Sequence, residues 1–332
     1  MDTENRFIAL ETKIAFMDDF INKLQNEVVE QQKLIEILYS DETICVINKP
    51  SGLLSVPYPG SRIRTAQSIL EEIMHKNGTF SSSHRPFAVH RLDRDTSGVM
   101  LFALTENAQK KIMDTWHQMV TERLYRAVAE NPRNKKLILP DCGLIDDELA
   151  FNAHNVGFVP KESENSKNNS DSYGENRRLK TVPARTNYKI LQSGPTHTLF
   201  ELSLDTGKKN QIRAHLASKG YPLAGDENYR ARTDHFGRLC LHARTLEFVH
   251  PFTGKKMKFE VPEPETWLEY VKKGDPNPKT PLWIESLKNS FDKKGERFHG
   301  KHENSLDLGQ KRLSKKDRAH MNFIEAGKKG RK

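Results

Sequence analysis

The stretch Val89-His-Arg-Leu-Asp-Arg-Asp-Thr-Ser-Gly98 runs directly into the apolar segment Val99-Met-Leu-Phe-Ala-Leu104. The apolar segment predicts a buried strand, and the polar stretch before it predicts a turn. Two arginines, two aspartates, a histidine and two hydroxyls so close together need partners or a substrate. One interpretation is a turn that satisfies itself through Arg–Asp pairs and hydroxyl caps. The other is a binding or catalytic site.

Residues 40–265 continue the same pattern on both sides of this stretch. Short β-rich runs are separated by Gly, Pro and Asp turns, and two segments have helical periodicity. This alternation predicts one α+β domain with a mixed, mostly antiparallel sheet and flanking helices. The polar segment 160–180 is expected to be a mobile surface insertion. The expected strands are 44–48, 99–104, 124–129, 198–204, 245–249 and 256–261, and the expected helices are 107–119 and 210–219.

Residues 1–39 have a different character. Apolar side chains recur at alternating steps of three and four from Phe7 to Leu38, which is a heptad pattern. Mostly β-branched a positions with mostly Leu at d favour a parallel two-stranded coiled coil, so residues 7–38 are a candidate homodimer interface. The alternative is an amphipathic helix that lies on its own domain, because Phe16, Phe20 and Leu34 widen the apolar face.

The basic charge of the chain is concentrated at its C-terminal end. The net charge is +9, and residues 271–332 contain 17 Lys/Arg against 8 Asp/Glu, whereas residues 1–39 contain 4 against 8. We therefore expect residues 266–332 to form a basic tail that is disordered when free and contacts RNA. The densest part of the tail includes Lys315, Lys316 and Arg318.

Several classes of protein are disfavoured. Three widely spaced cysteines without a CxxC pair argue against a disulfide framework, and the sequence has neither an 18-residue apolar run nor a signal peptide. The sequence has no glycine-rich loop for binding a dinucleotide or a nucleotide phosphate, and no HExxH zinc-binding motif. Its histidines are not spaced as metal ligands usually are. The expectation is a soluble, cytoplasmic protein without membrane contact, metal or cofactor.

Four further segments identify a family. They are Leu124-Tyr-Arg-Ala127, Gln211-Ile-Arg-Ala-His-Leu216, Leu241-His-Ala243 and His250-Pro-Phe-Thr-Gly254. Together with the His90-to-Gly98 stretch and the opening Val46-Ile-Asn-Lys-Pro-Ser-Gly-Leu53, they resemble the RluA-type pseudouridine synthases in order over residues 37–263. The N-terminal segment resembles the short SlyX coiled-coil proteins. The resemblance implies the pseudouridine synthase fold and an RNA uridine isomerase that needs no cofactor.

The resemblance also implies roles for individual residues. Asp93 corresponds to the catalytic aspartate, which attacks the sugar or the base or removes a ribose proton, and Arg213 to the arginine beside it. A base-flipping enzyme needs an aromatic platform, implied to be Tyr125, and a side chain that fills the vacated space, implied to be Arg91. Ile212 and Leu241 are implied to wall the base pocket, although core packing alone would also explain them.

One segment departs from the family pattern. Relatives usually have Arg-Thr/Ser-His-Gln after Thr-Gly, but here Thr206-Gly207 is followed by Lys208, Lys209 and Asn210. Both lysines remain candidates for contact with the RNA backbone, as point charges without the guanidinium fork.

The motifs and the resemblance therefore predict an RNA pseudouridine synthase. The run Gly52-Leu-Leu-Ser-Val-Pro57 is most similar to the subgroup that acts on large-subunit rRNA and the tRNA anticodon stem-loop, so rRNA and/or tRNA is the expected partner. One alternative is a non-catalytic RNA-binding or ribosome-associated protein that keeps the fold. Another is an oligomeric scaffold organised by residues 7–38, which explains the heptads but none of the motifs.

Overall fold

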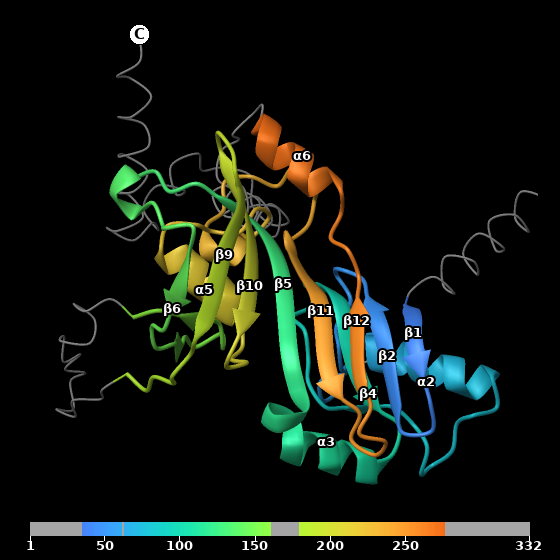
Figure 1. Ribbon diagram of the computed structural model, residues 1–332. Coiled ribbons are helices and arrows are strands. Elements are labelled where there is room, and N and C mark those ends of the chain that lie inside the picture. The colour runs from blue at the N-terminus through green and yellow to red at the C-terminus, as the bar shows by residue number, and fades with distance from the viewer. Residues whose placement is uncertain (1–34, 62, 161–178, 276–332) are drawn as a thin grey trace, which may run out of the picture. The chain divides into compact units, whose positions relative to one another are not determined.

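A ten-stranded sheet dominates the computed structural model, which describes residues 35–61, 63–160 and 179–275 (Figure 1). The strands are β1 Glu36–Ser40, β2 Ile44–Lys49, β3 Phe87–Ala88, β4 Ser97–Ala103, β5 Val120–Glu130, β6 Cys142–Ile145, β7 Ala150–Phe151, β8 Gly157–Phe158, β9 Thr186–Ser193, β10 His197–Leu204, β11 Leu241–Val249 and β12 Lys256–Glu260. The helices are α2 Ala66–Lys76, α3 Glu106–Met119, α5 Gln211–Ser218 and α6 Thr266–Lys273, with short 3-10 turns at η1 Lys135–Leu137 and η2 Glu227–Tyr229.

The main path of the sheet runs β1-β2-β4-β11-β5-β10-β9-β6, with β3 paired to β4 and β12 to β11, while β7 and β8 form a separate pair. Every pairing is antiparallel except that between β4 and β11. The expected α+β class with a mixed, mostly antiparallel sheet is therefore confirmed. All eight strands and helices expected from the sequence are present, with shifts of a few residues at their ends.

Helices cover both faces of the sheet. On one face, α2 packs on β2 and β4 while α5 packs on β5, β10 and β9, and Tyr125 of β5 contacts both of these apolar clusters. On the other face, α3 packs on β2, β4 and β11, and α6 packs near Val128 of β5 and Leu199 of β10. The first face thus has a seam along β5 between α2 and α5, where a pocket can form.

Local residues fix the start of α3 and the end of α5. Thr105 caps α3, since its hydroxyl accepts a hydrogen bond from the backbone N–H of Ala108. Gly220 follows α5 with φ +87°, a left-handed conformation that glycine adopts without strain.

The structure contradicts the C-terminal end of the helix that the heptads predict. Its last seam positions, Ile35 and Leu38, do not continue a helix, because Glu36–Ser40 is strand β1 and pairs antiparallel with β2. Ile35 is buried in the cluster under α2. The prediction of a helix through Leu38 is wrong at this end, and the other heptads lie outside the described residues.

The expected tail begins too early, because α6 belongs to the folded domain. Trp267 and Val271 are fully buried, and the Asp275 backbone N–H donates to the Thr196 hydroxyl. The domain therefore extends to residue 275 and not to 265. Residues 276–332 and the insertion at 161–178 lie outside the described residues. Within the part that is described, no helix is long and apolar enough to span a membrane.

Candidate active site

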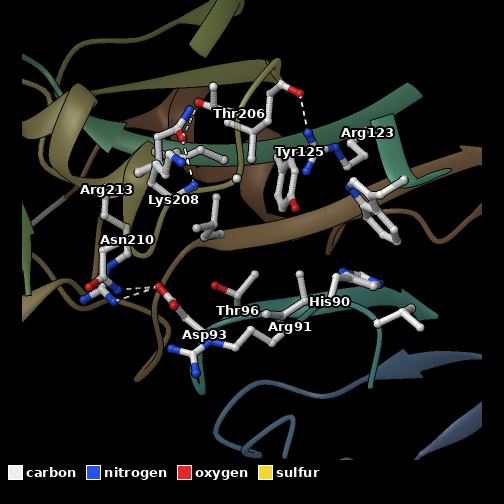
Figure 2. A pocket seen from close by; sticks show the side chains of 18 of the residues that line it. His90, Arg91, Asp93, Thr96, Arg123, Tyr125, Thr206, Lys208, Asn210 and Arg213 are labelled. Atoms are coloured by element: carbon white, nitrogen blue, oxygen red, sulfur yellow. Dashed lines mark hydrogen bonds and ion pairs between the residues drawn. The ribbon is translucent and has the colours of Figure 1, made fainter. Parts of the chain in front are cut away.

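A pocket of about 600 Å³ opens along the β5 seam (Figure 2). The loop before β4 lines one side of it, and the loop before α5 together with the first turn of α5 lines the other. The two sides come from segments more than a hundred residues apart in sequence. Seven of the expected site residues line this pocket: Arg91, Asp93, Tyr125, Lys208, Ile212, Arg213 and Leu241.

The loop that carries Asp93 is fixed from behind by a buried lysine. Lys49 is fully buried, and its Nζ donates to the carbonyl oxygens of Pro50, Leu53 and Arg94 at 2.7–2.9 Å. Burial lowers the pKa of Lys49 to about 7. Since the Arg94 carbonyl is the next one after Asp93, these hydrogen bonds hold the aspartate loop against the end of β2.

Asp93 faces two nitrogen donors from the opposite side of the pocket. Its Oδ2 accepts hydrogen bonds from Asn210 Nδ2 at 2.6 Å and from Arg213 Nη1 at 3.2 Å (Figure 2). Its Oδ1 accepts none from the described residues, and the side chain keeps 22% of its surface exposed. One carboxylate oxygen is thus held in place while the other is left for a substrate.

Arg213 is anchored mainly by a residue that the sequence did not point out. Its Nε and Nη2 donate to the two oxygens of Asp226 at 2.7 and 2.8 Å, and the Asp226 side chain is fully buried. Burial acts against the charge of Arg213, but the hydrogen bonds and charge of Asp226 outweigh it and hold the pKa above its usual value. The guanidinium also lies over the Tyr229 ring, 5.2 Å from its centroid. A fixed cation therefore faces Asp93.

Asn210 has an unusual backbone conformation at the start of α5. Its φ of +57° and ψ of +19° are left-handed, a region that asparagine tolerates better than most residues. Its side chain does not cap the helix, because it donates to Asp93 instead. The sequence marked Asn210 only as a departure from the family pattern, and its contact with Asp93 is visible only in three dimensions.

Aromatic and cationic side chains lie on the other side of the pocket, with Tyr125 in between (Figure 2). Tyr125 is half-buried, and burial raises its pKa, so the ring remains a neutral phenol. His90 is likewise neutral, because burial lowers its pKa to about 3, and its Nε2 accepts the Leu101 N–H. Arg123 donates from Nη2 to the Leu204 carbonyl at 2.7 Å.

The remaining expected residues fall into three groups. Ile212 and Leu241 are each 4% exposed, so they wall the pocket and belong to the core at the same time. Lys208 lines the pocket and is exposed, whereas Lys209 is not among the lining residues. The other candidates for RNA contact, Lys315, Lys316 and Arg318, lie outside the described residues.

The pocket carries more positive than negative charge. Arg91, Arg123, Lys208 and Arg213 line it together with a single carboxylate, Asp93. Arg91 is exposed and makes no ion pair or hydrogen bond with the described residues. A cleft of this sign attracts a polyanion. The arrangement combines one oriented carboxylate, a flat aromatic surface and several cations that a phosphate backbone can contact.

Comparison with known proteins agrees with this geometry. Residues 43–218 match the family model described as RNA pseudouridylate synthase, and residues 3–41 match the SlyX model. The chain is 32% identical over 256 residues to "Ribosomal large subunit pseudouridine synthase D" of Neisseria meningitidis, a match that covers 71% of this chain and 60% of the relative. It is also 32% identical to "Uncharacterized RNA pseudouridine synthase YlyB" of Bacillus subtilis, covering 74% of each chain.

A solved structure supports the fold. The human protein "RNA Pseudouridylate Synthase Domain Containing 4" superposes with a TM-score of 0.55 at 22% identity, covering 75% of this chain and 98% of the human chain. The chain spans less than two thirds of the length of its Neisseria relative, but the family match includes both Asp93 and Arg213. The chain belongs to the RNA pseudouridylate synthase family.

Proposed function

We propose that this protein is an RNA pseudouridine synthase that isomerises uridines in ribosomal RNA, with Asp93 as its catalytic residue. The observation that carries the proposal is the single carboxylate in the pocket, with one oxygen held by Asn210 and Arg213 and the other free of hydrogen bonds from the described residues. The family match supports the same assignment.

The reaction needs few chemical groups. The N1–C1′ bond of uridine breaks, the uracil rotates, a C5–C1′ bond forms, the hydrogen on C5 leaves as a proton, and N1 takes up a proton. No net oxidation or reduction occurs. Asp93 starts this exchange as a carboxylate, and the guanidinium of Arg213 lies beside it, with Nη1 3.2 Å from Oδ2.

The substrate base has to leave its stack before Asp93 can reach it. Tyr125 offers the flipped uracil a neutral ring to stack against, and Ile212 and Leu241 supply apolar walls. Arg91, which has no partner among the described residues, fills the space that the base vacates. The cations around the pocket hold the neighbouring phosphates.

The experiment is release of tritium from RNA labelled at uridine C5. Asp93→Asn is expected to abolish release while RNA affinity stays within a few-fold of the wild type. The matched control is Asp95→Asn, because Asp95 lies in the same loop, pairs with the exposed Arg94 and does not line the pocket. Activity in Asp93→Asn would contradict the proposal. A wild-type protein that binds RNA without releasing tritium would favour a non-catalytic RNA-binding protein.

The proposed target is the large ribosomal subunit, because several relatives are named as synthases acting on it. Pseudouridines mapped in total RNA from cells that lack the protein should show a missing site in ribosomal RNA. A site missing only from transfer RNA would replace ribosomal RNA as the target. A site missing from neither RNA would contradict both assignments.

The N-terminal segment is proposed to join two copies of the chain through its heptads, in the cytoplasm, where RNA is modified. Light scattering on the full chain and on residues 35–332 should give twice the chain mass for the first and a single mass for the second. Equal oligomeric states would favour a helix that packs on its own domain.

A further inference from the structure

The pocket is longer than a single uracil requires. A cavity of about 600 Å³ is in the range that holds a drug-sized ligand, so a base beside Asp93 and Tyr125 fills only part of it. The remaining part is lined by α3, through Met113, Trp116 and His117. Trp116 and His117 lie three and four residues after Met113, so both neighbour Met113 on the helix surface.

Trp116 is placed to bind a ligand as well as to support the core. It adjoins the apolar cluster of α3, but it is only half-buried, whereas Ile112 on the same helix is completely buried. Its ring lies 4.9 Å from that of His90 at an angle of 37°. Its indole N–H makes no hydrogen bond with the described residues, and Met113 beside it is 56% exposed. Trp116 thus packs against the core while part of the residue stays accessible from the pocket.

The α3 part of the pocket also has a positively charged residue, Arg123. Figure 2 shows Asp93 and Arg213 at one end, His90 and Arg123 at the other, and Tyr125 between them. Arg123 is held by one hydrogen bond, from Nη2 to a backbone carbonyl, and its Nε and Nη1 have no partner among the described residues. A guanidinium anchored in this way has donors left for a phosphate.

We propose that the α3 end of the pocket is a second nucleobase site, which takes the unpaired base next to the target uridine in the RNA chain. The base stacks on Trp116, and Arg123 binds the phosphate that joins the two nucleotides. This inference rests on the proposed function, because it requires a flipped uridine at Asp93. Continuity of one cavity from Asp93 to Trp116 is what ties the second occupant to the same RNA strand.

The test uses short single-stranded oligoribonucleotides with a central uridine. One oligonucleotide is intact, a second lacks the base on the 5′ side of the uridine, and a third lacks the base on the 3′ side. Affinity is measured by fluorescence anisotropy of a 3′ dye on the full-length protein. Loss of one flanking base is expected to weaken binding to the wild type by about 5- to 150-fold, the effect of one base–aromatic stack. Trp116→Leu should bind the intact and the abasic oligonucleotide equally, and Trp116→Phe should recover part of the difference.

Matched controls separate the site from the fold. Gln118 is exposed on the same helix but does not line the pocket. Gln118→Ala should therefore prefer the intact over the abasic oligonucleotide as strongly as the wild type does. Exposed His117 lines the pocket, so His117→Ala should reduce discrimination even if Trp116→Leu fails to fold. The inference would be overturned if Trp116→Leu preferred the intact over the abasic oligonucleotide as strongly as the wild type does. If Trp116→Leu cannot be purified, the same result for His117→Ala would overturn it. Tritium release tests the proposed function separately, because discrimination is measured by binding alone.

Discussion

Replacing Asp226 should destabilise the protein far more than replacing the proposed catalytic aspartate, although both contact the same arginine. Asp226→Ala removes both hydrogen bonds that hold Arg213 Nε and Nη2. The guanidinium, whose side chain is 8% exposed, then keeps one 3.2 Å hydrogen bond to Asp93. Asp93→Asn leaves the pair between Arg213 and Asp226 intact.

The magnitudes follow from burial. Removing one partner of a buried ion pair costs about 3–5 kcal/mol, because the remaining charge is left without compensation. Asp226 is fully buried, so Asp226→Ala should lower the free energy of unfolding by that amount. Asp93 is 22% exposed, and an asparagine at this position still offers a carbonyl oxygen to the donors. Its replacement should therefore cost about 1 kcal/mol, the net value of one hydrogen bond.

Urea unfolding at pH 7 measures both variants against the wild type. Asp234→Ala is the control, since Asp234 is an exposed aspartate in the same region, and its replacement should change stability by less than about 0.5 kcal/mol. Asp226→Ala should also lose most tritium release, because Arg213 is no longer held toward Asp93. Equal destabilisation by Asp226→Ala and Asp93→Asn would refute the argument that Asp226 is the main anchor of Arg213.

Three further predictions follow. Between about pH 8 and 9.5 the unfolding free energy of the wild type should rise relative to that of Lys49→Met by up to about 1.4 kcal/mol per pH unit, because Lys49 takes up a proton on unfolding in this range. A constant difference would contradict the lowered pKa of Lys49. Gly98→Ala should prevent soluble expression, since a Cβ there would lie 2.1 Å from the Ala243 oxygen, whereas Gly60→Ala, with an open Cβ position, should cost only about 1–2 kcal/mol. Deleting residues 276–332 should flatten the salt dependence of RNA binding by about 0.7 per lost phosphate contact, and an unchanged slope would exclude the tail from binding.

The parts of the fold that the sequence predicts are those with local signals. The strand Ser97–Ala103 is buried at every position and contains a continuous apolar run from Val99 onward, and α3 carries both a cap and an apolar face. The two wrong boundaries depend on distant partners. Ile35 and Leu38 fit a heptad as well as a strand, and only pairing with β2 decides between them. The helix α6 buries Trp267 against strands that lie far away in the sequence.

The site residues likewise divide into those that a local motif identifies and those that only the fold brings together. Asp93, Arg213 and Tyr125 stand in contiguous motifs, so a resemblance to a family was enough to place them, and they do line one pocket. Asp226 follows a glycine in an ordinary turn, and nothing in the local sequence connects it with Arg213. Trp116 has the periodicity of a core residue, because helical spacing does not distinguish the centre of an apolar face from its edge.

The segment Lys208–Asn210, which departs from the family pattern, places two different side chains at the pocket. Lys208 is exposed and lines the pocket, so it contributes a positive charge there. Asn210 is 9% exposed, and its left-handed backbone turns the amide toward Asp93, while the helix N-terminus is left without a side-chain cap. Without the Asn210 side chain, Asp93 would keep its ion pair with Arg213 but lose its shortest hydrogen bond. Lys208 and Asn210 therefore act on different features, the charge that lines the pocket and the position of the Asp93 carboxylate, and these two effects can be separated by mutating each residue alone.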